Sequence, residues 1–126
     1  MHVSKSKEPQ ITTRDMFTGT VSSHNHVTEE HAEQLRINLV HFEPGGRTKW
    51  HTHTFEQGLI VVEGKGIVAT EDAEHVIEPG DVVLIPEGEK HWHGGTETTG
   101  MSHFSINPSA GESTVIEPVT EVKTKV

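Results

Sequence analysis

A chain of 126 residues predicts a single domain, and because only 31% of its residues are hydrophobic, part of the burial can come from self-association. Its formal net charge of −9 at pH 7 argues against a nucleic-acid partner, since phosphate binding needs a basic surface. The chain has no cysteine, no run of about 18 apolar residues and no apolar stretch near its N-terminus, which excludes disulfides and a membrane partner and predicts a cytoplasmic protein.

Short Val, Ile and Leu runs between 12 glycines and 6 prolines predict an all-β fold. Residues 1–13 are polar, and we expect a loose arm or a strand that pairs only in an oligomer. Residues 16–21 predict a first short strand. The polar stretch 22–34 carries three histidines, but it lacks apolar support and is expected to be a solvated loop rather than a second metal site.

The middle of the chain predicts strands joined by tight turns. Residues 35–42 alternate in a way that is typical of a strand, and Pro and Gly in 43–46 favour a turn. The apolar run 59–62 predicts the next strand, followed by a hairpin connection at 64–66. Residues 66–69 would then pair back on that strand.

The second half of the chain predicts four more short strands, at 75–77, 82–85, 101–107 and 114–116. Between them, Gly94 and Gly95 are expected to be flexible. No segment has a sustained helical period, and regular turn signals favour a closed barrel or a two-sheet sandwich. We assign residues 14–118 to the barrel domain and 119–126 to a charged tail.

The densest chemistry lies between Gly45 and Gly64. His51 and His53 are two residues apart, and Gln57 follows four residues later. If this stretch is extended, all three side chains point the same way, because side chains alternate along a strand. Two imidazoles and an amide oxygen from one region are the beginning of a metal site that needs a fourth ligand from elsewhere.

Two motifs resemble those of the cupin superfamily. The first, G-x5-H-x-H-x3,4-E-x6-G, is matched by Gly45, His51, His53 and Gly64, with Gln57 in place of Glu. The second, G-x5-P-x-G-x2-H-x3-N, is matched by Gly80, Pro86, Gly88 and His91, with Gly95 in place of Asn. The resemblance covers about residues 35–107 and implies a single-domain jelly-roll β-barrel of two antiparallel sheets with a metal in its mouth.

Within this superfamily, the sequence resembles one subgroup, which includes manganese-dependent cupin hydroxynitrile lyases and cupins associated with carboxymuconolactone decarboxylases. That resemblance implies four metal ligands, His51, His53, Gln57 and His91. It favours Mn(II), although mixed nitrogen and oxygen donors also suit Fe(II), Zn(II), Ni(II) or Co(II). Residues 54–56 replace a typical Pro-x-Gly, and Asn107 stands where one lyase has Gln, so the substrate stays open.

Further residues are candidates for catalysis. The resemblance points His103 into the pocket, and alternation places His93 on the face of His91. A neutral histidine beside the metal can take or give a proton near neutral pH, which suits His103 as general base; His93 can equally serve by hydrogen bonding alone. Thr48 can bind a substrate oxygen or stabilise its turn.

The pocket wall is expected to include Asn38, Val40 and Asn107, although Asn38 and Val40 can also be plain packing.

Four neutral ligands leave a divalent ion its full +2 charge, which favours Lewis-acid chemistry over higher oxidation states. We therefore expect a metal-dependent lyase or isomerase acting on a small oxygenated carbon compound, with hydroxynitrile-lyase-like activity. The alternatives are a cupin dioxygenase and a non-catalytic cupin that binds metal or small molecules. The resemblance also implies a homodimer, because small cupins commonly dimerise through one sheet.

Overall fold

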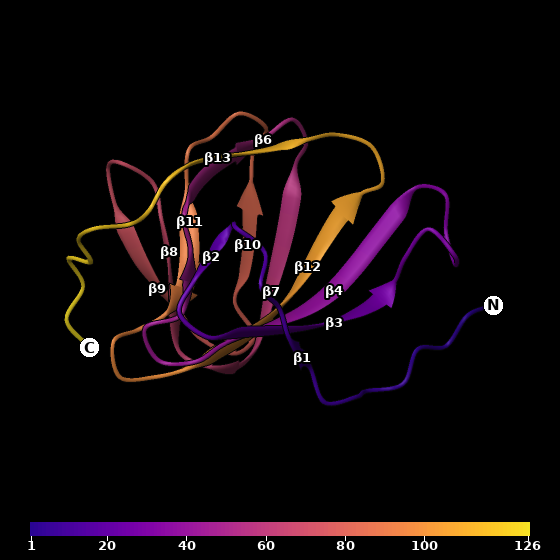
Figure 1. Ribbon diagram of the computed structural model, residues 1–126, viewed down its shortest axis with the longest axis horizontal. Helices are drawn as coiled ribbons and strands as arrows, with labels where there is room; N and C mark the ends of the chain where they lie inside the picture. The colour runs from indigo at the N-terminus through magenta and orange to yellow at the C-terminus, as the bar shows by residue number, and fades with distance from the viewer.

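Thirteen strands and no helix make up the computed structural model, which describes all 126 residues (Figure 1). A six-stranded sheet has the order β1 (Gln10–Ile11), β3 (Val21–Val27), β4 (Leu35–Phe42), β12 (Met101–Pro108), β7 (Gln57–Gly64) and β10 (Val82–Ile85). A five-stranded sheet has the order β2 (Phe17–Thr18), β5 (Arg47–Thr48), β11 (Trp92–Gly95), β8 (Gly66–Ala69) and β9 (Glu74–Ile77). A two-stranded sheet pairs β13 (Ser113–Glu117) with β6 (Trp50–His53).

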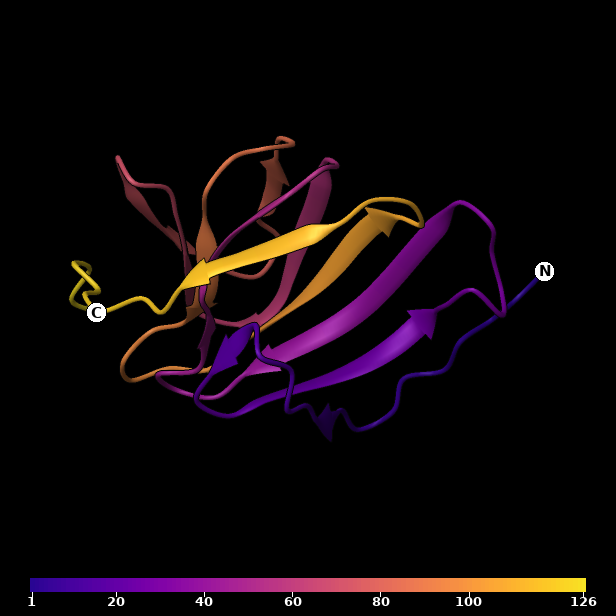
Figure 2. The ribbon, with the colours of Figure 1, turned by 45° about the horizontal axis from the view of Figure 1, so that its top comes forward.

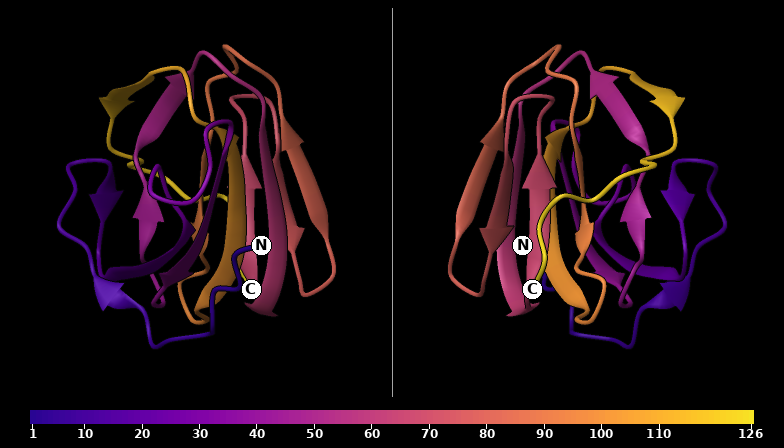
Figure 3. Two further views of the ribbon diagram at one scale, coloured as in Figure 1. Left: turned by 90° about the vertical axis from the view of Figure 1, so that its right-hand side faces the viewer. Right: turned by 90° about the vertical axis from the view of Figure 1, so that its left-hand side faces the viewer.

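All strand pairs are antiparallel, and the strands wrap around a common interior (Figures 2 and 3). Strands β6 and β13 lie at one end of the barrel, the upper end in Figure 1. The all-β, single-domain prediction with two main antiparallel sheets is confirmed. No helix is long and apolar enough to cross a membrane.

The inward face of β4 and β12 changes from apolar to polar along the strands. The facing pairs, in order, are Phe42–Met101, Val40–His103 and Asn38–Ser105. Phe42 and Met101 are fully buried in a cluster of seven apolar residues, so they form the core end of the barrel. The same two strands then present polar side chains to the rest of the interior. The alternation of two strands thus builds both the core and one wall of the candidate site.

The connection at Gly64 differs from the predicted hairpin. Strand β7 pairs with β12 and β10, whereas β8 pairs with β11 and β9 in the other sheet. Residues 64–66 therefore carry the chain between sheets, and the prediction that 66–69 pairs back is wrong. Gly64 has φ of 77°, and a Cβ there would overlap the carbonyl oxygen of Gly100, so this tight crossing requires glycine.

Two segments that were expected to be loops are strands. Residues 21–27 form β3, which pairs with β1 and β4, because a ladder of backbone hydrogen bonds does not need an apolar pattern on its exposed side. Gly94 and Gly95 are buried in β11 rather than flexible. A Cβ at Gly94 would overlap the Arg47 side chain, so glycine permits the close approach of β5 and β11.

Both termini dock on the barrel. Strand β1 pairs with β3 of the same chain, so the expected loose arm, or strand pairing only in an oligomer, is wrong at these residues. At the other end, Val119 is buried in a cluster with Trp92. The backbone N–H groups of Lys123 and Thr124 donate to the Glu74 carboxylate at 2.9 and 2.7 Å, and these bonds outweigh burial and lower the pKa of Glu74.

Candidate metal centre

The two histidine-bearing segments meet through a backbone bridge. The N–H of His51 donates to the carbonyl of His91 at 3.0 Å, and the N–H of His91 donates back at 3.1 Å. His53 ends β6, and Gln57 begins β7 after a short bend, so the stretch is not continuously extended as assumed from the sequence. All four side chains are buried and gather at the same end of the interior.

The three imidazoles of this set are oriented in the same way, each by a backbone carbonyl. The Nδ1 atoms of His51, His53 and His91 each lie 2.8 Å from a backbone carbonyl oxygen, those of Lys49, Phe55 and Glu89. A carbonyl only accepts, so each Nδ1 carries a proton, and in the neutral imidazole the Nε2 then keeps its lone pair. This is the arrangement found for histidines that bind a metal through Nε2. The buried Nε2 of His91 has no hydrogen-bond partner, as expected for a ligand atom.

The side-chain amide of Gln57 is oriented by two residues of β12. Its amide nitrogen donates to Ser105 Oγ at 2.8 Å and to Asn107 Oδ1 at 2.9 Å, which uses both amide hydrogens. Its Oε1 lies 3.2 Å from Nε2 of His53. In the neutral imidazole of His53 this Nε2 is an acceptor, so two acceptor atoms face each other, and a cation between them would remove the repulsion. Two ligand atoms at right angles, each about 2.1 Å from an ion, lie about 3 Å apart, so the residues fit a divalent metal.

A second grouping of ligand atoms involves His93. Ligand nitrogens of His51, His91 and His93 all lie within 4.8 Å of one another, so these three could also hold a metal. His93, however, has its Nδ1 3.0 Å from Nε2 of His103 rather than at a backbone carbonyl. The set of His51, His53, Gln57 and His91 therefore stays the predicted ligand set, and His93 competes with His53 for a place in it.

Four of the buried histidines are neutral at pH 7. Burial lowers the pKa of His51 to about 4 and, with the neighbouring His51, the pKa of His91 to about 3. Burial also lowers the pKa of His103 to about 4 and, together with His103, holds the pKa of His93 well below its ordinary value. Neutral imidazole is the form that binds a divalent metal and accepts a proton.

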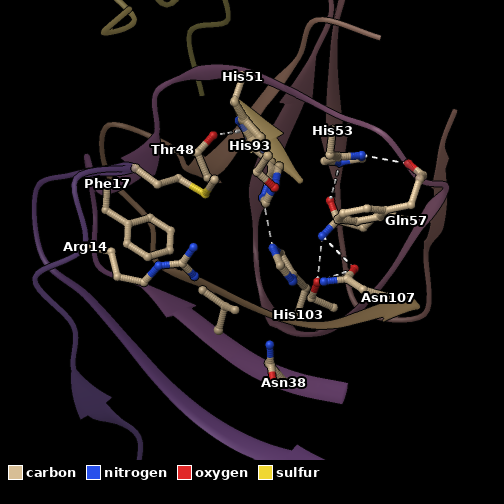
Figure 4. A pocket seen from close by; sticks show the side chains of 15 residues that line it. Arg14, Phe17, Asn38, Thr48, His51, His53, Gln57, His93, His103 and Asn107 are labelled. Carbon is tan, nitrogen blue, oxygen red and sulfur yellow. Dashed lines mark hydrogen bonds between the residues drawn. The ribbon is translucent and has the colours of Figure 1, made fainter. Parts of the chain in front are cut away.

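The predicted pocket residues lie together. Asn38, Val40 and Asn107 line one cavity of about 530 Å³, its open mouth included. The candidate catalytic residues Thr48, His93 and His103 line the same cavity (Figure 4). The hydroxyl oxygen of Thr48 accepts a hydrogen bond of 3.1 Å from the backbone N–H of His93. It thereby ties β5 to β11 and keeps its own hydrogen free to donate into the cavity.

Sequence reasoning missed several residues of the cavity, among them Arg14, Phe17 and Ser105. Ser105 could have been found, since it alternates with His103 and Asn107 on one strand. Arg14 lies just before β2 and Phe17 begins that strand, and nothing in their local pattern connects them with the histidines.

The histidines of residues 22–34 stay outside this site. The rings of His24 and His26 contact each other at 4.2 Å, and His31 stacks on His2 at 3.7 Å. They do not join a group of three converging ligand atoms.

Comparisons with known proteins agree with this geometry. The family model described as Cupin domain matches residues 38–107. A curated protein named (R)-mandelonitrile lyase, from Granulicella tundricola, is 46% identical over 93 residues, which cover 73% of this chain and 71% of that protein. A cupin-like protein of Thermotoga maritima is 34% identical, with a TM-score of 0.85 over 92% of this chain and 90% of that one. The polyketide cyclase RemF of Streptomyces resistomycificus shares the fold, with a TM-score of 0.81 at 16% identity over 98% and 88% of the two chains.

Proposed function

The chain belongs to the cupin family, and on this premise we propose that it is a metal-dependent lyase or isomerase acting on a small oxygenated carbon compound. The observation that carries the proposal is that Nε2 of His53, whose Nδ1 donates to the Phe55 carbonyl, faces the oriented Oε1 of Gln57 at 3.2 Å. The relative named (R)-mandelonitrile lyase supports cleavage of a 2-hydroxynitrile as the first activity to test.

In this proposal His51, His53, Gln57 and His91 hold a divalent transition metal, for which Mn(II) is the first choice. When bound, the ion supplies a Lewis acid, because four neutral ligands leave its +2 charge uncompensated. The same neutrality disfavours higher oxidation states and makes a dioxygenase the weaker alternative.

His93 and His103 act as one acid–base pair. Their hydrogen bond of 3.0 Å joins Nδ1 of His93 to Nε2 of His103, so a proton taken up by one ring can be shared with the other. For a 2-hydroxynitrile, the pair removes the hydroxyl proton, the oxygen forms a carbonyl, and the bond to the nitrile carbon breaks. Cyanide leaves with the bonding electrons and receives the proton from the pair. Thr48 donates its hydroxyl hydrogen to the substrate oxygen.

Metal content and activity test this proposal together. Wild type, His53→Ala and the control His75→Ala, whose histidine is exposed on β9, are produced in media supplemented with manganese, iron or zinc. We expect near-stoichiometric metal in the wild type and the control, little in His53→Ala, and benzaldehyde formation from (R)-mandelonitrile only in the metal-containing proteins. Equal metal in all three proteins, or little metal in any of them, would overturn the ligand set. Full metal loading without turnover would favour a binding protein.

We also propose that the protein is a homodimer joined through the outer face of the six-stranded sheet. Val82, Ile60, Phe104 and Leu39 face one another in register across β10, β7, β12 and β4. Leu84 lies beside this row, and Val82 and Leu84 are 71% and 64% exposed. An antiparallel sheet with one face to water normally has polar residues on that face. An apolar row that continues to the edge strand suits the same surface on a second copy.

A further inference from the structure

The cavity has one permanent charge on its wall, and that charge is positive. Of the residues that line the cavity, Arg14 is the only arginine or lysine, and none is Asp or Glu. This is notable in a chain that carries 19 acidic residues. The predicted metal ligands are also neutral, so nothing in the cavity balances a bound cation or the guanidinium.

The guanidinium of Arg14 has no partner of its own. The chain has three arginines, and Arg36 donates to the carbonyls of Ala32 and Leu35 while Arg47 pairs with Glu97 at 3.8 Å. The Arg14 side chain makes neither a hydrogen bond nor an ion pair, and its guanidinium carbon lies 5.9 Å from the centroid of the Phe17 ring. The neighbouring acid cannot neutralise it, since Asp15 pairs with Lys49 at 3.1 Å.

The position of Arg14 is set by the fold. The N–H of Phe17 donates to the carbonyl of Arg14 at 3.1 Å, which closes a turn, and Phe17 pairs with Thr48 of β5. The pairing of Phe17 with β5 therefore places this turn beside the strand that carries Thr48. Figure 4 shows Arg14 and Phe17 on the opposite side of His93 and His103 from Gln57 and Asn107. The positive charge of Arg14 also contributes to the low pKa of His51.

We propose that Arg14 binds a carboxylate of the substrate, so that the site prefers small 2-hydroxy or 2-oxo carboxylates to neutral compounds of the same shape. This rests on the proposed function, because it names the substrate class of the same cavity, and it makes 2-hydroxynitrile cleavage a secondary activity of the same lyase chemistry. A guanidinium donates two parallel hydrogen bonds to a carboxylate, a geometry that a neutral amide or nitrile cannot match. Arg14 is an exposed residue of the cavity wall, and the ring of Phe17 lies within cation–π distance of its guanidinium.

Isothermal titration with (R)-mandelate and its neutral amide, (R)-mandelamide, tests the proposal. The proteins are wild type, Arg14→Gln, Arg14→Lys and the control Lys125→Gln, which removes the same charge from an exposed residue outside the cavity. We expect wild type to favour mandelate, and Arg14→Gln to weaken mandelate binding about fivefold or more without changing the amide. Arg14→Lys should keep part of the preference, since lysine keeps the charge but loses the paired hydrogen bonds.

An unchanged ratio of mandelate to mandelamide affinity in Arg14→Gln would overturn the proposal, as would an equal loss in Lys125→Gln. Metal content is measured on the same samples. If the metal centre itself is wrong, this shows in the metal analysis, and the same ratios are then compared in the metal-free proteins, where the effect of Arg14 should persist.

Discussion

The Nδ1 atom of His93 lies 3.0 Å from the Nε2 atom of His103, and both rings are buried against Phe42. One of the two nitrogens must donate and the other accept, so the tautomers of the rings are coupled. Burial keeps both rings neutral. Either ring can therefore take a proton from a substrate in the cavity and share it with the other through this hydrogen bond.

Replacing His103 by Gln should reduce turnover and leave the metal in place. The amide keeps a hydrogen-bonding group near His93 but cannot take a proton, so kcat should fall by roughly a hundredfold to ten-thousandfold. Steady-state kinetics and metal analysis of the same samples measure this. His41→Gln is the matched control, since His41 bonds Ser102 on the same two strands outside the cavity. A kcat within about twofold of wild type would contradict the acid–base role.

His93→Ala separates the two candidate ligand sets. His93 belongs to the three-histidine group, but its Nδ1 is bonded to His103 and not to a carbonyl. We expect this variant to keep its metal and lose turnover, whereas His53→Ala loses the metal. Metal analysis after dialysis decides between them. Metal lost from His93→Ala and retained by His53→Ala would assign the site to His51, His91 and His93.

Removing the two side chains that accept hydrogen bonds from the Gln57 amide should weaken metal binding, although neither is a predicted ligand. Ser105→Ala combined with Asn107→Leu takes away both acceptors of the Gln57 amide, which can then turn its nitrogen toward the site. Loss of such orienting bonds typically lowers metal affinity by about 10- to 100-fold. Competition with a chelator measures the change. Ser109→Ala, an exposed serine just after β12, is the control. Unaltered affinity in the double variant would show that Gln57 is not a ligand.

The sequence predicts the strands of this fold better than their partners. The alternation of 35–42 and 101–107 predicted β4 and β12 and, through them, a wall of the cavity. Strand β3 was missed because its residues are polar and its order comes from pairing with β1 and β4. The change of sheet at Gly64 was missed because a glycine turn in sequence does not reveal which distant strand lies beside it.

The candidate site, like the fold, could be predicted only in part from the sequence. His51, His53, Gln57 and His91 could be selected because their spacing follows a known motif. The carbonyls that fix each Nδ1 are backbone groups and leave no residue signal. Arg14 reaches the cavity through a turn that pairs with β5, and only the folded chain brings it near the histidines.

Leu84→Glu should convert a dimer to a monomer. Leu84 is 64% exposed on the edge strand β10, and a carboxylate there would be buried without a partner in the proposed interface. Size-exclusion chromatography with light scattering measures the mass. Val76→Glu, on the edge strand of the other sheet, should leave the dimer unchanged. A monomeric wild type would contradict the interface.

Acid should destabilise the metal-free protein well above the pH at which carboxylates titrate. The pKa of His51 and of His103 falls to about 4 in the folded chain, and that of His91 to about 3, compared with an ordinary value of 6.5. Between these values the unfolded chain binds more protons than the folded one. The free energy of unfolding therefore rises with pH and is lost as pH falls below about 6.5, by about 1.4 kcal/mol per pH unit for each histidine that stays neutral.

Urea unfolding of the metal-free protein at pH 7.5, 6.0 and 5.0 measures this slope. His103→Leu removes one of the buried groups, so its free energy of unfolding should depend on pH less steeply than that of wild type. His75→Ala, which removes an exposed histidine, should keep the wild-type slope. A free energy of unfolding that stays constant from pH 7.5 to 5.0, or that rises on acidification, would mean that these imidazoles are not held neutral. The folded chain would then not favour the neutral forms of His51 and His91 that bind a metal.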